Sequence, residues 1–76
     1  MNEEFDEYLK NVKNLISIWE STPRSIEVAK DLNLNLTFLK VLIGSERFES
    51  LDAFCRYMRE TSKFINQKEE NENEKK

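Results

Sequence analysis

The segment from Ser25 to Gly44 constrains the fold more than any other part of the chain. Its apolar and small residues fall where two short helices that cross steeply would need them: Val28, Ala29, Leu32, Leu34, Leu39 and Leu42. The small side chain of Ala29 would let the second helix approach, and Leu34 would fill the turn. Asn33 lies where the turn needs a left-handed backbone, which Asn tolerates better than most residues other than glycine. The spacing therefore predicts a helix-turn-helix.

Helical spacing and capping residues extend this prediction to most of the chain. We expect four helices, over residues 3–20, 23–32, 35–43 and 50–66. Thr22 and Pro23 suit the start of the second helix, Gly44 suits the end of the third, and Ser50 suits an N-cap of the fourth. Residues 45–49 are expected to form a loop. The predicted fold is all-α, a small four-helix domain over residues 1–66 that contains the helix-turn-helix.

The last ten residues, 67–76, contain no apolar side chain. Such a stretch buries nothing that would offset the entropy lost on ordering. We therefore expect a disordered polar tail or a solvated extension of the fourth helix, outside the domain.

Composition argues against several classes of function. The chain has one cysteine, Cys55, and no histidine, so neither an internal disulfide nor a zinc site is expected. Without histidine, a phosphate-cradling glycine loop or a nucleophile elbow, we expect no enzyme, no cofactor and no small-molecule substrate. No apolar run is long enough to cross a membrane, and the acidic N-terminus is unlike a secretory signal. These features predict a cytoplasmic location without a membrane partner.

Three runs of residues follow the order of a known family. They are Ile26, Val28, Ala29 and Leu32, then residues 35–39, then residues 43–47 with residues 50–54. Over roughly residues 22–60 this order resembles the phage-repressor (Cro-like) helix-turn-helix family, in which a glycine-containing loop follows the recognition helix. The resemblance implies a transcriptional regulator that binds duplex DNA, with a homodimer on a paired site as one form.

The resemblance also implies which residues would face DNA. The implied base-facing and phosphate-facing residues are Asn35, Thr37, Lys40, Arg24, Ser25 and Arg47. Simpler roles stay open, because Asn35 also suits a helix cap, and Lys40 and Arg47 could be ordinary solvated charges. Arg56, Arg59 and Lys63 share a face of the fourth helix and could contact phosphate, although Arg56 could equally form a surface ion pair with Glu60.

A second interpretation comes from the apolar character of residues 36–43. If Leu36 and Val41 face outward there, the surface fits a protein partner at least as well as DNA. The net charge of −3 also does not favour binding to nucleic acid. The alternative is a protein-binding module, such as an antirepressor or a phage-encoded inhibitor of a host protein.

The apolar stripe of the first helix leaves two roles open. It consists of Phe5, Leu9, Val12, Ile16 and Trp19, at steps of four and three. The stripe could pack on the rest of the domain or, because the same steps match a heptad, pair with the first helix of another copy.

Overall fold

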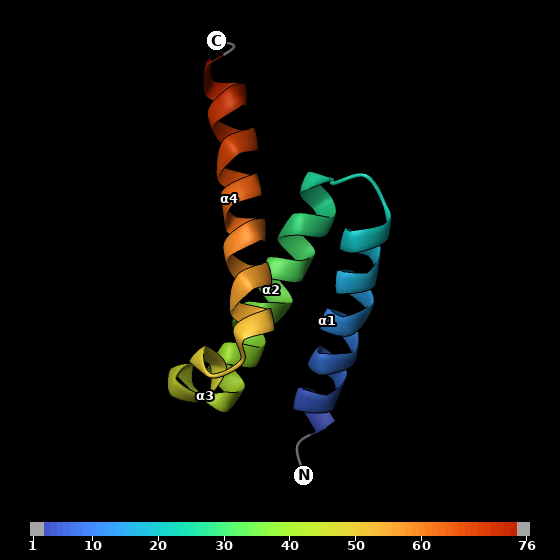
Figure 1. Ribbon diagram of the computed structural model, residues 1–76, viewed down its shortest axis with the longest axis vertical. Coiled ribbons are helices and arrows are strands. Elements are labelled where there is room, and N and C mark those ends of the chain that lie inside the picture. The colour runs from blue at the N-terminus through green and yellow to red at the C-terminus, as the bar shows by residue number, and fades with distance from the viewer. Residues whose placement is uncertain (1–2, 75–76) are drawn as a thin grey trace.

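Helices account for nearly all of the computed structural model, which describes residues 3–74 and the side chains of residues 3–70. In chain order they are α1 (Glu3–Ser21), α2 (Ile26–Ile43), α3 (Ser45–Glu49) and α4 (Asp52–Glu74). The three long helices run up, down and up, and the short α3 turns the chain between α2 and α4 (Figure 1). No strand occurs in residues 3–74. The predicted all-α fold is confirmed.

The expected corner between two short helices is wrong, because α2 is one unbroken helix through Asn33. Among residues 3–74 only Gly44 has a positive φ, so Asn33 does not adopt the left-handed backbone of a turn. Leu34 does not fill a turn either, since 53% of its surface is exposed. Ala29 is buried as expected, but it lies in the same helix as Leu39 rather than beneath a second one.

Hydrogen bonds explain why three polar residues are accommodated in the middle of α2. The amide of Asn33 donates to the hydroxyl oxygens of Thr61 at 3.0 Å and Ser62 at 2.9 Å, both on α4. Asn35 donates its amide to a backbone carbonyl one turn earlier at 2.8 Å, and the hydroxyl of Thr37 does the same at 2.9 Å. Asparagine and threonine weaken a helix mainly when their side chains compete for its backbone hydrogen bonds. Here each of the three side chains donates to an acceptor without breaking a backbone hydrogen bond of α2.

Both ends of α2 carry capping signals. The hydroxyl of Ser25 accepts from the backbone N–H of Val28 at 3.2 Å, which caps the first turn. At the other end Gly44 has φ of 92° and donates its N–H to the carbonyl of Lys40, so the predicted helix end is confirmed. The expectation that Thr22 begins this helix is wrong. Its hydroxyl donates to the backbone carbonyl of Ile18 at 2.7 Å and so closes the end of α1.

The C-terminal half differs from the prediction in three places. Residues 45–49 form the helix α3 and not a loop. Ser50 caps the end of α3, with its hydroxyl donating to Arg47 at 2.6 Å, and α4 begins at Asp52. The helix then continues to Glu74, so residues 67–74 are a helical extension and not a disordered tail. The predicted tail's residues 75–76 lie outside the described part.

α2 packs against both α1 and α4, and the core lies along its inner side. The buried apolar residues are Val12, Trp19, Ala29, Leu32, Leu36, Leu39, Phe48 and Tyr57. Phe5, Leu9 and Ile16 of α1 pack against this cluster, so the apolar stripe of α1 contributes to the domain's own core. Within that core Trp19 meets Phe64 edge-on, with ring centroids 5.5 Å apart. This aromatic contact joins the end of α1 to α4.

Candidate protein-interaction face

The six residues implied to face DNA do not come together on one surface. Arg24 and Ser25 precede α2, whereas Arg47 follows it, and 18 helical residues span roughly 27 Å between them. The guanidinium of Arg24 lies 4.2 Å from the ring centroid of Trp19 and also donates to its carbonyl oxygen. Arg24 and Ser25 therefore have structural roles at the junction between α1 and α2.

The three implied base-facing residues of α2 point in different directions. At about 100° per residue, Asn35 and Thr37 lie roughly 160° apart around the helix. Lys40 is half-buried, and its ammonium group lies 6.0 Å from the ring centroid of Phe48. These side chains could not enter one groove of DNA together without a change in the helix.

The two residues expected to form an apolar outer surface have opposite environments. Val41 is 75% exposed, in agreement with that prediction. Leu36 is fully buried and cannot contact a partner, so its assignment to the outer surface is wrong. The error follows from the missing corner, because a continuous helix turns Leu36 toward the same side as Leu32 and Leu39.

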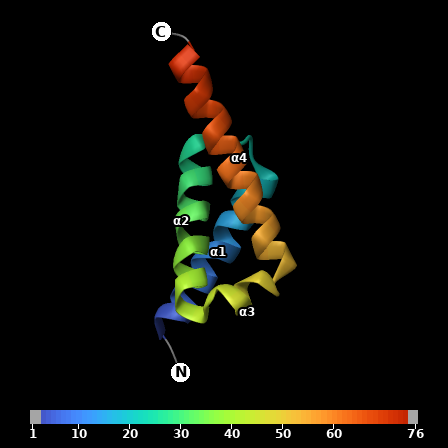
Figure 2. The same ribbon diagram turned by 90° about the vertical axis from the view of Figure 1, so that its left-hand side faces the viewer.

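Large apolar side chains nevertheless form a line on the outer side of α2. Leu34, Phe38 and Val41 are exposed by 53%, 40% and 75% of their surface. Steps of four and three residues put them on one side of the helix, opposite the buried side chains. Figure 2 shows α2 along one edge of the molecule, with α4 and the later turns of α1 on its inner side and the first turns of α1 beside its lower end. We call these three residues the outer face of α2.

Aromatic and apolar residues of α1 extend this surface sideways. The ring of Tyr8 lies 5.2 Å from that of Phe38, tilted by 30°. Beyond them is an open hollow of about 280 Å³, lined by Phe5, Leu42, Ile43 and Arg47. A partner that covers Phe38 could therefore also place a side chain in the hollow.

Charged side chains flank the two ends of the outer face. Glu27, Lys30 and Asp31 are exposed on the two turns that precede Leu34. Arg47 is exposed at the opposite end, on α3. None of these four charged side chains forms an ion pair with another described side chain.

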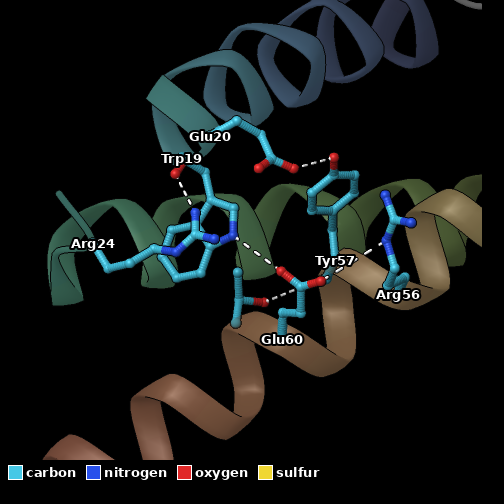
Figure 3. A network of polar contacts seen from close by, with 7 residues as sticks. Trp19, Glu20, Arg24, Arg56, Tyr57 and Glu60 are labelled. Carbon is cyan, nitrogen blue, oxygen red and sulfur yellow. Dashed lines mark hydrogen bonds and ion pairs between the residues drawn. The ribbon is translucent and has the colours of Figure 1, made fainter. Parts of the chain in front are cut away.

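A polar network closes the opposite side of the molecule, between the end of α1 and α4 (Figure 3). The indole N–H of Trp19 donates to Glu60 at 3.4 Å, and the hydroxyl of Tyr57 donates to Glu20 at 2.5 Å. This hydrogen bond, and secondarily burial, raises the pKa of Tyr57 above its usual value. The network's hydrogen bonds join the end of α1 to α4.

The expected ion pair between Arg56 and Glu60 is present, with 3.8 Å between the nitrogen and oxygen atoms. Both side chains are largely exposed, so the pair contributes little to stability. Of the three basic residues expected to share a face of this helix, Arg56 is thus paired on α4 itself. Phosphate contact through Arg59 and Lys63 stays a prediction.

Two features of the site were missed from sequence. Leu34, Phe38 and Val41 have the spacing of one helix face in the sequence. The expected corner divided the segment into two helices, so this shared face was not predicted. The contacts of Asn33 with α4 had no local signal, because their partners lie 28 and 29 residues away.

No family model, curated protein or solved structure matches this chain. None of the helices in the described part is long and apolar enough to cross a membrane. No group of at least three acidic, cysteine or histidine side chains in that part could hold a metal ion.

Proposed function

We propose that this chain is a protein-binding module that docks another polypeptide on the outer face of α2. One observation carries the proposal: three large apolar side chains are exposed in a line on the helix whose inner side forms the core. Contiguous exposed apolar surface of this kind marks interaction sites in water-soluble domains. A helix with both sides apolar also suits the docking of a second helix along its length.

The energetics favour a contact wider than the three side chains. Full burial of one such side chain contributes about 1.5–3 kcal/mol, so covering their remaining exposed surface contributes about 2.5–5 kcal/mol in total. Association costs at least about 4 kcal/mol in lost translational and rotational freedom. A stable partner must therefore also cover Tyr8 or fill the hollow beside Leu42 and Ile43.

DNA binding is less well supported than binding to protein. It depended on a short recognition helix after a corner at Asn33, and α2 has no such corner. The two turns that precede the outer face expose Glu27, Lys30 and Asp31, a net charge of −1 that does not attract phosphate. DNA binding stays a prediction, and a binding titration at two salt concentrations decides it, because backbone contacts make affinity fall steeply with salt.

The proposal is tested by photo-crosslinking in the cells that express the chain. The crosslinking residue p-benzoylphenylalanine replaces Phe38, and a matched control places it at Leu51, which has the same exposed fraction of 40% but lies outside α2. We expect a discrete crosslinked protein from position 38, lost when Val41→Asp is added, and none from position 51. Equal products from both positions, or persistence with Val41→Asp, would refute the proposed function.

A further inference from the structure

We draw no further inference here: the strongest candidate, the exposed apolar line of Leu34, Phe38 and Val41 along the outer side of α2, is the surface on which the proposed function already rests, and nothing in the structure shows what covers it.

Discussion

Replacing Asn33 separately by alanine and by glycine measures whether α2 is continuous at this position. Both substitutions remove the amide that donates to Thr61, Ser62 and the carbonyl of Met58. Two lost amide N–H donors cost about 1–3 kcal/mol of unfolding free energy in either variant. The hydroxyl of Thr61 keeps its bond to the carbonyl of Tyr57 at 2.9 Å, so its burial adds no further unpaired donor.

The difference in unfolding free energy between the two variants measures which backbone conformation position 33 adopts. In a helix interior glycine is about 1 kcal/mol less favourable than alanine, so Asn33→Gly should be less stable than Asn33→Ala by that amount. For a domain of this size the gap corresponds to about 4–8 °C in Tm. In a left-handed corner the sign reverses, because alanine there costs about 1–2 kcal/mol relative to glycine.

Urea unfolding followed by circular dichroism measures both variants. The same pair of substitutions at Thr37, an exposed position of α2, supplies the reference gap for an ordinary helical residue. We expect the two gaps to agree in sign and to within about 0.5 kcal/mol. An Asn33→Gly chain that is as stable as Asn33→Ala, or more stable, would refute the unbroken helix.

Three further predictions concern the rest of the molecule. Because the pKa of Tyr57 is raised in the folded chain, its contribution to stability is complete below the usual tyrosine pKa of about 10 and is lost as pH rises above it. Unfolding free energy measured from about pH 8 to 11 should therefore fall, and Tyr57→Phe should flatten the fall; parallel curves would contradict this. Arg24→Ala removes a hydrogen bond and a ring contact at Trp19, so we expect a loss of about 1–2 kcal/mol and a red shift of the Trp19 emission. An unchanged spectrum and Tm would show that Arg24 does not hold this junction. Ending the chain after Glu70 removes only polar residues and should change the unfolding free energy by less than about 0.5 kcal/mol in a urea titration, whereas a larger loss would indicate tertiary contacts in residues 71–76.

The parts of the fold that local physics determines could be predicted from the sequence. The apolar stripe of α1 repeats at helical steps and has one face to bury, so its span was predicted to within a residue of Glu3–Ser21. Gly44 marked the end of α2 because only glycine takes its positive φ without strain. The ion pair of Arg56 with Glu60 followed from a spacing of four residues on one helix.

The remainder depended on contacts that are distant in sequence. Asn33 looks like a turn residue locally, and only its acceptors on α4 make it a residue of a helix interior. Leu36 and Val41 could not be told apart while the segment was divided in two. Once α2 is continuous, its period places Leu36 in the core and Val41 on the outer face.

The most direct test of the account is photo-crosslinking of the full chain from the three positions of the outer face, Leu34, Phe38 and Val41. If that face is the binding surface, all three positions should give the same crosslinked protein. Arg59 and Lys63, on α4, should give none. Products confined to α4, or no product from any of these positions, would contradict it.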